Sequence, residues 1–220
     1  MAASLADLGF KKGVVAETIL STCSVEGKPN AAPMGMTMKD EQHLIVDLFN
    51  TSQTYRNIKS NRCAVANLTD DIEIFYFSAF KEANPKGKLP VEWFEKASCV
   101  NAPKLRLADA FIEVLVEHME LLETNGTMKT RAALRVETIH AAQSYPQVFS
   151  RARSLTVEAI VAATRVKAFS KIKTKQKHVV KLLEVISDCH QVVNRVAPSS
   201  PYSQVMDDLV QRVKSWRKMP

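Results

Sequence analysis

The sequence predicts a mainly β fold with an α-helical extension, in which a small antiparallel barrel precedes three helices. Three observations support this prediction. Short apolar segments bounded by turn residues fill most of residues 17–142, as closely spaced strands do. After residue 146 the apolar side chains recur at helical spacing instead. The 220 residues, 46% of them hydrophobic, suffice for a sizeable core. We therefore expect two parts, residues 1–145 and residues 146–220.

Six segments of the first part have the composition and length of strands. Each is rich in apolar or β-branched side chains and is separated from the next by polar or turn-forming residues. The segments are residues 17–22, 30–38, 44–49, 63–68, 110–122 and 131–141. The last two are predicted to meet at Asn125-Gly126, a dipeptide that favours tight hairpins. Strands spaced this closely, with one short helix among them, fit a small antiparallel barrel.

The connections between these strands carry further elements. Three consecutive capping residues, 50–52, precede a short helix that ends near Asn61. Residues 72–77 alternate in polarity, which predicts another strand or an exposed edge. Residues 81–104 contain three prolines and a glycine and are expected to form a long connection, with a helical turn at residues 91–96.

Three amphipathic helices are predicted in the second part. Their stripes are Leu155, Ala159, Ala162, Ala163, Val166 and Phe169; Val179, Leu182, Leu183, Ile186, Cys189 and Val193; and Val205, Leu209, Val213 and Trp216. The lysine-rich residues 171–177 join the first two helices, and the prolines within residues 197–201 separate the second from the third. Each helix has one stripe to bury, so the three must pack on one another, on the barrel or on a second subunit.

Charge is distributed unevenly along the chain. Residues 151–220 hold 14 Lys or Arg and 5 Asp or Glu, whereas residues 1–150 hold 16 and 18. Such an asymmetry is typical of a protein with an anionic partner, and equally of solvated lysine-rich helices. Aromatic side chains are not interleaved with the basic ones, so we do not expect a nucleic-acid partner.

Cysteine usage and hydropathy favour a cytoplasmic protein. Cys23, Cys63, Cys99 and Cys189 form no CxxC pair, which argues against a zinc ribbon and against a disulfide framework. We expect reduced, mostly buried thiols and no metal site. No apolar run approaches the roughly 20 residues that cross a bilayer, and the first residues lack the apolar region of a secretory signal. We therefore expect no membrane partner.

The segment from Asn50 to Asn57 is the strongest candidate for a binding site. Thr51, Ser52 and Thr54 place hydroxyl groups at the start of a helix, where free backbone N–H groups and the helix dipole favour an anion. Arg56 would add a charged fork for a phosphate. Helix capping by itself accounts for one of these hydroxyl groups. On the residues alone both interpretations stay open.

A series of motifs resembles the flavin-reductase-like branch of the FMN-binding split barrels. Residues 32–36 (APMGM) are similar to that branch's APxSx strand, residues 54–58 (TYRNI) to its KDTxxNI helix start, and residues 64–68 (AVANL) to its xxVNL strand. Residues 102–114 are similar to its later P-x-L and A-x-x-E-C-x-V strand entry. The resemblance covers residues 15–142. With the helical extension, the chain looks closest to an uncharacterised family of FMN-binding split-barrel proteins.

The resemblance implies a six-stranded split barrel that binds FMN near the interface of a homodimer. The isoalloxazine would lie along one strand, with backbone groups at its polar edge, and the phosphate would lie at the helix start. The implied contacts are Met34, Gly35, Met36, Thr37, Asn50, Thr51, Ser52, Thr54 and Arg56. The reductases' Lys-Asp pair is Ser52-Gln53 here, so Arg56 or a cation from elsewhere must replace the lysine. Their strand serine is Gly35.

The resemblance also implies a flavin-dependent oxidoreductase, with NAD(P)H or a small substrate as hydride donor. A non-catalytic flavin carrier whose basic helices dock a partner is the alternative. A flavin-free adaptor that uses residues 151–220 on nucleic acid is a third hypothesis. No catalytic residue is assigned; His118 and His140, on late strands, are the candidates to face the flavin. With only six glycines and no Gly-rich loop, the chain is not expected to contain a Rossmann fold.

Overall fold

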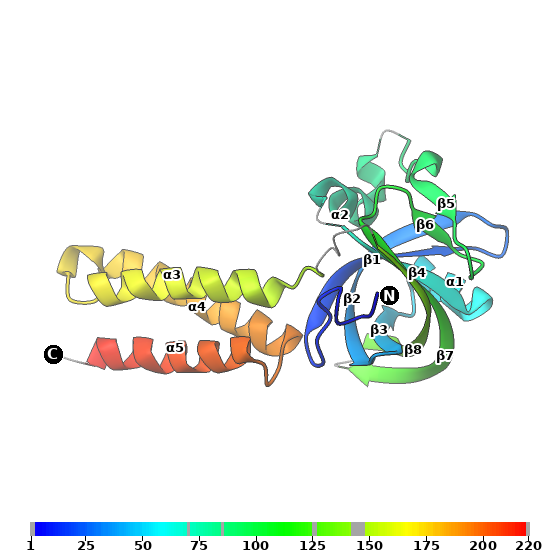
Figure 1. Ribbon diagram of the computed structural model, residues 1–220. Coiled ribbons are helices and arrows are strands. Elements are labelled where there is room, and N and C mark those ends of the chain that lie inside the picture. The colour runs from blue at the N-terminus through cyan, green and yellow to red at the C-terminus, as the bar shows by residue number, and fades with distance from the viewer. Residues whose placement is uncertain (1–2, 70, 85, 125–126, 142–147, 219–220) are drawn as a thin grey trace. The chain divides into compact units, whose positions relative to one another are not determined.

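Six antiparallel strands close into a barrel in the computed structural model of the protein (Figure 1). Around the barrel the strand order is β1-β2-β3-β8-β7-β4. The strands are β1 (Val15–Cys23), β2 (Pro29–Asp40), β3 (His43–Phe49), β4 (Cys63–Leu68), β7 (Ala110–Thr124) and β8 (Thr127–Ala141). The predicted barrel and all six of its strands are thus confirmed.

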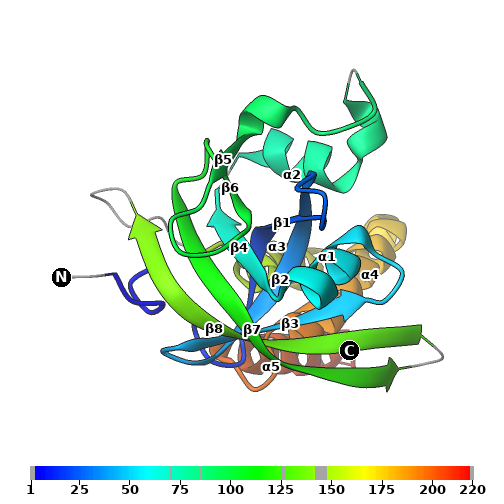
Figure 2. The ribbon, with the colours of Figure 1, turned by 90° about the vertical axis from the view of Figure 1, so that its right-hand side faces the viewer.

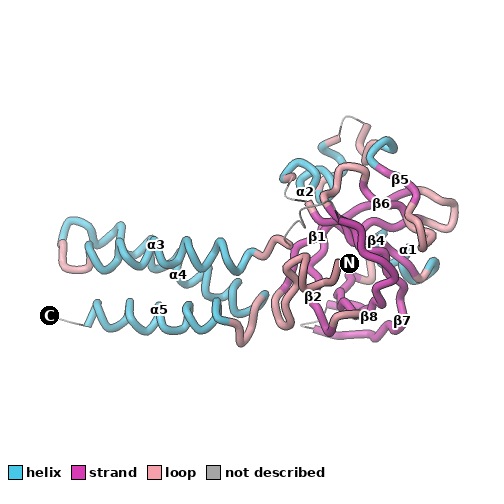
Figure 3. The backbone as a smooth tube through the Cα atoms, in the orientation of Figure 1, coloured by secondary structure: helices cyan, strands magenta, loops and turns pink. Residues whose placement is uncertain are grey.

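The structure describes residues 3–69, 71–84, 86–124, 127–141 and 148–218. The chain divides into two compact units, residues 1–149 and residues 150–220. Figure 3 shows every described strand in the first unit and three long helices in the second. The predicted turn at Asn125-Gly126 lies outside the described residues, while the strands on both sides of it run together as a long hairpin (Figure 2).

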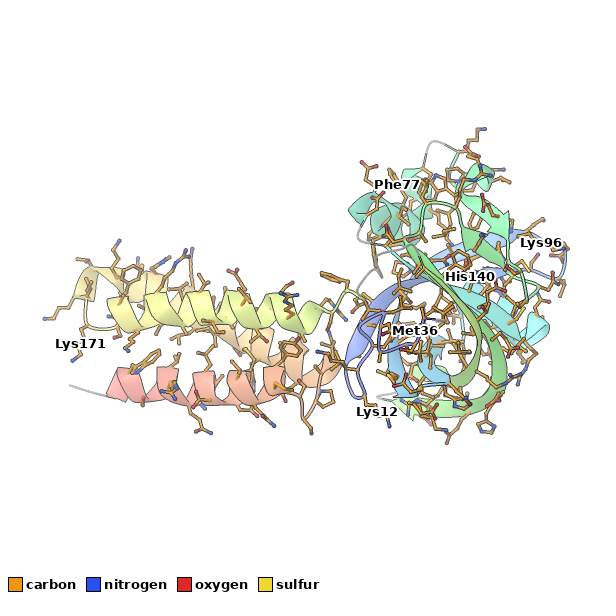
Figure 4. The ribbon with its side chains drawn as sticks, in the orientation of Figure 1. Lys12, Met36, Phe77, Lys96, His140 and Lys171 are labelled. Atoms are coloured by element: carbon orange, nitrogen blue, oxygen red, sulfur yellow. The ribbon has the colours of Figure 1, made fainter. Side chains whose placement is uncertain are left out.

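Alternating side chains fill the barrel, as the period of two along a strand requires. In β2, Met36 and Met38 are buried in the main core and Met34 packs against it; Figure 4 labels Met36 inside the barrel. Leu20 of β1 and Leu44 of β3 belong to the same cluster. Residues of the opposite parity face outward, so the two faces of β2 have different neighbours.

Helix α1 (Gln53–Asn61) begins and ends as the sequence predicts. The hydroxyl group of Ser52 accepts the backbone N–H of Tyr55 and caps the first turn. At the other end Arg62 adopts a left-handed conformation, with φ of 56°, and its backbone N–H donates to the carbonyl oxygen of Ile58. Ile58 is fully buried in the main core. This contact fixes the helix against the barrel.

The strand or exposed edge predicted at residues 72–77 is wrong, because these residues form helix α2 (Ile72–Ala79). The Asp71 carboxylate accepts the backbone N–H of Glu73 at 2.8 Å and caps the first turn. Ile74 and Ser78, one helical turn apart, are both buried. Ile74 packs with Ile19 of β1 on the outer face of the barrel. Packing on this face therefore selects helix over the alternation seen in the sequence.

The long connection after α2 contains short elements. These are the 3-10 turns η1 (Lys81–Ala83) and η2 (Val91–Trp93) and a two-stranded sheet of β5 (Phe94–Lys96) and β6 (Pro103–Leu105). The predicted helical turn at residues 91–96 is therefore half correct, since its second half is a strand. In both ribbon views α2, β5 and β6 lie on one side of the barrel (Figures 1 and 2).

A buried carboxylate anchors the segment between β5 and β6. Glu113 of β7 is fully buried and accepts the backbone N–H groups of Ser98, Cys99 and Val100 at 2.8, 2.6 and 3.1 Å. Burial by itself would raise the pKa of Glu113, but these three hydrogen bonds outweigh it and hold the pKa below the usual range. The carboxylate therefore acts as a charged anchor for the segment.

The second unit contains the three predicted helices, α3 (Arg151–Phe169), α4 (Gln176–Val196) and α5 (Pro201–Lys218), with the 3-10 turn η3 (Lys173–Lys175) between the first two. The predicted stripe of α4 is confirmed, because all its members except the half-buried Leu183 are buried. In α5 the prediction fails at Val205, which is 41% exposed, whereas the adjacent Met206 is fully buried. Met206 lies three residues before Leu209 and continues the stripe better than Val205 does.

Candidate functional site

The start of α1 offers free hydrogen-bond donors. The first backbone N–H groups of a helix have no partner within it. Ser52 accepts one of them from Tyr55, and its carbonyl oxygen accepts the N–H of Arg56. Within the described ranges, no acceptor lies in hydrogen-bond range of the backbone N–H groups of Gln53 and Thr54. These two N–H groups and the helix dipole make this end of α1 suitable for an anion.

A buried polar network lies directly beside this helix start. The Asn30 side-chain amide donates to the hydroxyl oxygens of Thr22 and Thr54, at 3.4 and 3.2 Å. The Asn57 amide donates to the same Thr22 oxygen at 2.9 Å. All four side chains are buried. Because both threonine oxygens accept these bonds, each hydroxyl group keeps its own proton available to donate.

Lys81 supplies a cation to this network from a distant part of the chain. Its ammonium group donates to the side-chain oxygen of Asn30. The side chain is half-buried, and burial lowers the pKa of Lys81 below the ordinary lysine value. Among the residues that the structure describes, no carboxylate lies within ion-pair distance of it. Two of its three N–H donors therefore have no partner there.

These donors suit a phosphate monoester. The set combines one ammonium group, the Thr54 hydroxyl group and two backbone N–H groups, and no anionic side chain is among them. A phosphate accepts several charge-assisted hydrogen bonds at once and neutralises a cation that burial would otherwise destabilise. The residues present therefore fit a phosphate group.

An unpaired strand edge lies next to this donor set. β2 pairs with β3 only from Met36 to Asp40, although it pairs with β1 along Pro29–Thr37. The edge of β2 from Pro29 to Gly35 that faces away from β1 thus has no strand partner in the described part of the chain. Over this stretch β2 and β3 are not paired, although the six strands close into a barrel. Asn30 lies within this edge, so the donor set and the open edge adjoin.

Two of the four predicted ring contacts lie on this open edge, and the other two lie in the paired part of the strand. Met34 is half-buried and Gly35 is exposed, and both lie on the open edge. Met36 is fully buried in the core, and both Met36 and Thr37 are paired on their two sides, with β1 and with β3. Their backbone groups are therefore committed to the sheet. Of the four predicted ring contacts, only Met34 and Gly35 lie on the open edge, where a planar ligand can approach.

Gly35 is required by a protein neighbour. A Cβ atom built on it would lie 2.7 Å from Cγ1 of Val15. The absence of a side chain thus lets β1 cross closely at this point. The missing strand serine is explained by this packing.

The predicted phosphate contacts have different neighbours in the structure. Thr54 belongs to the donor set, and Ser52 is engaged as the helix cap. The Asn50 side-chain oxygen accepts from the Thr130 hydroxyl group at 2.8 Å, and Thr51 is exposed. These two residues have no hydrogen bond to the donor set.

Arg56, the named candidate for the phosphate cation beside a cation from elsewhere, is engaged by hydrogen bonds within its own helix start. Arg56 is exposed, and its guanidinium donates to the carbonyl oxygen of Thr51 and to the side-chain oxygen of Gln53, each at 2.9 Å. It is held by its own helix start on the solvent side. Lys81 is the cation hydrogen-bonded into the network beside Thr54, as the alternative of a cation from elsewhere anticipated.

The two histidines considered as flavin neighbours lie on β7 and β8. His118 is exposed at an irregularity in β7. His140 stacks on Phe111, with 4.6 Å between ring centroids, and its Nε2 lies 3.6 Å from the Glu113 carboxylate (Figure 4). Within the described part of the chain, neither histidine is hydrogen-bonded to α1, to Lys81 or to the open edge of β2.

Sequence reasoning missed Asn30 and Lys81. Asn30 had a weak signal, since it is a polar side chain at an inward position of a strand. Lys81 had no local signal, because its position depends on α2, which the sequence predicted as a strand or edge.

The described residues contain neither a membrane-spanning helix nor a cluster of metal ligands. No helix there has the length and apolar character needed to cross a membrane. No group of three or more His, Cys, Asp or Glu side chains there is placed to hold a metal ion.

Known proteins place the chain among split barrels. A family model described as "Protein of unknown function (DUF447) N-terminal domain" matches residues 16–143. An FMN-bound protein from Methanosarcina mazei, related to the same family model, is 24% identical over 95% of this chain and 99% of that chain, with a TM-score of 0.52. Nitrilotriacetate monooxygenase component B from Bacillus cereus is 17% identical over 65% of this chain and 78% of that chain, with a TM-score of 0.50. No curated protein sequence matches the chain.

These likenesses confirm the predicted fold. Both solved structures share the arrangement of the barrel, and the match to the Methanosarcina protein extends over nearly the whole length of both chains. The family model covers more than half of this chain, including every strand of the barrel except the first residue of β1. The protein therefore belongs to the family described as the DUF447 N-terminal domain.

Proposed function

We propose that the protein binds FMN, with the phosphate at Lys81 and the start of α1. The observation that carries this proposal is the half-buried Lys81 ammonium, which keeps two unused donors and has no carboxylate partner in the described part of the chain. A cation in such a place is costly unless an anion neutralises it. The FMN-bound state of the Methanosarcina relative supports the same choice of ligand.

The isoalloxazine would lie along the open edge of β2. Met34 would offer an apolar, adaptable contact, and the exposed Gly35 allows close approach to the backbone. The unpaired backbone groups of this edge would hydrogen-bond the polar side of the ring. When bound, FMN supplies a centre that accepts and returns electrons. The chain's own part is to bind and orient it.

The proposed activity is that of a flavin-dependent oxidoreductase, with NAD(P)H or a small molecule as the electron donor. The resemblance of the barrel motifs to flavin reductases supports this. Anaerobic addition of NADH or NADPH to flavin-loaded protein should bleach the yellow absorbance. Protein that holds FMN and stays oxidised with both donors would instead favour the flavin carrier.

The proposed assembly is a homodimer with FMN near the interface, working in the cytoplasm. A two-fold interface is the commonest kind among homo-oligomers, and a second barrel would cover the open edge of β2. Light scattering after size exclusion should give twice the chain mass for flavin-loaded protein. A flavin-loaded monomer would contradict the dimer.

The identity of the cofactor is tested on the purified full-length protein. The protein should be yellow as isolated or after incubation with flavins. Acid release followed by chromatography should give FMN, since the donor set fits one phosphate group. Colourless protein after incubation with excess FMN would refute the proposal, and released FAD would show that the ligand is larger.

A further inference from the structure

Two cysteines lie at the adjoining ends of two neighbouring strands of the barrel. Cys23 ends β1 and Cys63 begins β4. The ladder between these strands pairs Ile19 with Asn67 and Ser21 with Val65. The ladder ends at Ser21 and Val65; if its register is continued by two residues along each strand, Cys23 and Cys63 come to opposing positions. Both have the parity of Ser21 and Val65, so both side chains leave the same outer face of the barrel.

The two thiols lie under one short segment of chain. Cys63 packs with Ala97, Val100 and Ala102 in a cluster on this face. The Cys23 thiol donates to the carbonyl oxygen of Asn101 at 3.1 Å. The backbone of Asn101 also lowers the pKa of the Cys63 thiol, although burial raises this pKa more. A single residue thus influences both thiols.

This arrangement fits the geometry of a disulfide. Residues directly opposite in an antiparallel ladder have Cα atoms about 4.5 or 5.5 Å apart, and disulfides span Cα separations of about 4.4–6.8 Å. We propose that Cys23 and Cys63 are a redox pair, which a peroxide oxidises to a cross-strand disulfide on the outer face of the barrel. Cys99, which is exposed, and Cys189, which lies in the other unit, are not members.

The reaction proceeds in two steps. The Cys23 thiolate attacks one peroxide oxygen, the O–O bond breaks, and the leaving hydroxide takes a proton to become water. Cys63 then attacks the resulting sulfenic acid, the S–S bond forms, the S–O bond breaks, and a second water leaves. The two thiols lose two electrons and two protons, and the peroxide is reduced to two waters.

Both thiols are buried, and Cys23 is the first to react because it is the less buried of the two, 8% exposed against 3% for Cys63. It lines a groove of about 340 Å³ together with Gly27, Phe94 and Asn101, and Cys63 does not line this groove. Burial raises the pKa of both thiols. The thiolate fraction is therefore small near neutral pH, and the oxidation should accelerate about tenfold per pH unit below the thiol pKa.

The test uses full-length protein and hydrogen peroxide. After the reaction the protein is quenched in denaturant with an alkylating agent, and its tryptic peptides are analysed without reduction. We expect one linked product that joins the Cys23 peptide to the Cys63 peptide and disappears after reduction. The oxidised protein should also melt several degrees higher than the reduced protein, because the new bond restricts the unfolded chain.

Three variants identify the roles of the thiols. Cys99→Ser should form the linked product at the wild-type rate. Cys63→Ser should accumulate a sulfenic acid at Cys23 that dimedone traps, whereas Cys23→Ser should leave Cys63 unmodified. The proposal is overturned if Cys23 and Cys63 both remain alkylatable at alkaline pH after Cys99 has been oxidised. It is equally overturned if either one is found linked to Cys99, to Cys189 or to a second chain.

Discussion

The ammonium group of Lys81 donates a hydrogen bond to the side-chain oxygen of Asn30, 51 positions earlier in the chain. The Asn30 amide nitrogen is engaged with Thr22 and Thr54, which fixes the orientation of its side chain. Lys81 is therefore directed to the start of α1. This contact joins the segment after α2 to the open edge of β2, and it brings a positive charge to Asn30 from a distant part of the sequence.

The burial of Lys81 should make the flavin-free protein more stable as the pH becomes alkaline. Because burial lowers its pKa below 10.5, the unfolded state binds the proton more tightly than the folded state. The free energy of unfolding should therefore increase as the pH rises from the pKa of Lys81 in the folded protein to its pKa in the unfolded chain. Urea unfolding of wild type and Lys81→Met across this range isolates the contribution. A difference between the two that does not change with pH would contradict it.

The hydroxyl groups of Thr54 and Ser52 should have separable effects. Thr54→Val removes a donor from the phosphate site, and a hydrogen bond to a charged group is worth about 1.5–3 kcal/mol, on the order of a 10- to 100-fold loss of FMN affinity. Ser52→Ala removes the helix cap and should cost about 1 kcal/mol of stability with little change in affinity. Fluorescence titration and urea unfolding measure the two. The assignment fails if Ser52→Ala weakens FMN binding more than Thr54→Val.

Gly35→Ala should destabilise the barrel through a single clash. The added Cβ would meet Cγ1 of Val15 at 2.7 Å. Overpacking of this kind costs about 1–3 kcal/mol, measured as a lower urea midpoint. Val15→Ala, introduced together with Gly35→Ala, removes the clashing atom and should restore part of the loss. No rescue in the double variant would show that the cost has another source.

Glu113 should contribute stability that is lost in acid. Its pKa is depressed in the folded state, so the unfolded state binds more protons between the folded pKa and the ordinary value of 4.5. Its contribution is complete above 4.5 and falls as pH drops through the folded pKa. Glu113→Gln should lower the free energy of unfolding by roughly 1.5–3 kcal/mol at neutral pH. The difference in this free energy between variant and wild type should become smaller in acid. A difference in the free energy of unfolding between the two proteins that stays constant with pH would contradict this.

The strands and α1 were predictable because their signals are local. Turn residues bound each strand of the barrel, and Ser52 caps α1 directly. The helix at residues 72–77 was not predictable, because the alternation of polar and apolar residues there matches a strand. Capping by Asp71 and the packing of Ile74 on the outer barrel face favour a helix instead. The prediction that Val205 belongs to the buried stripe of α5 is wrong for a related reason. Val205 and Met206 are adjacent apolar residues that could each continue the stripe, and only the packing shows that Met206 is the buried one.

The site was predictable only in its location. The hydroxyl groups at the start of α1 and the resemblance of residues 32–36 to a flavin-reductase strand pointed to two parts of the barrel, and β2 and α1 are neighbours through Asn30 and Thr54. The sequence named Arg56 as a candidate for the cation because that residue is close to the helix start, and left a cation from elsewhere as the alternative. Lys81 reaches the site through a tertiary contact, for which a single sequence gives no signal.

The most direct test of the account compares FMN with riboflavin, which lacks the phosphate, in titrations of wild type, Lys81→Met and Arg56→Met. Wild type should bind FMN more tightly than riboflavin. Lys81→Met should lose on the order of 10- to 100-fold in FMN affinity and keep its riboflavin affinity, because only the charge on the phosphate is unmatched. Arg56→Met should resemble wild type with both ligands. Equal affinity of wild type for the two flavins, or an FMN affinity unchanged by Lys81→Met, would contradict the proposed phosphate site.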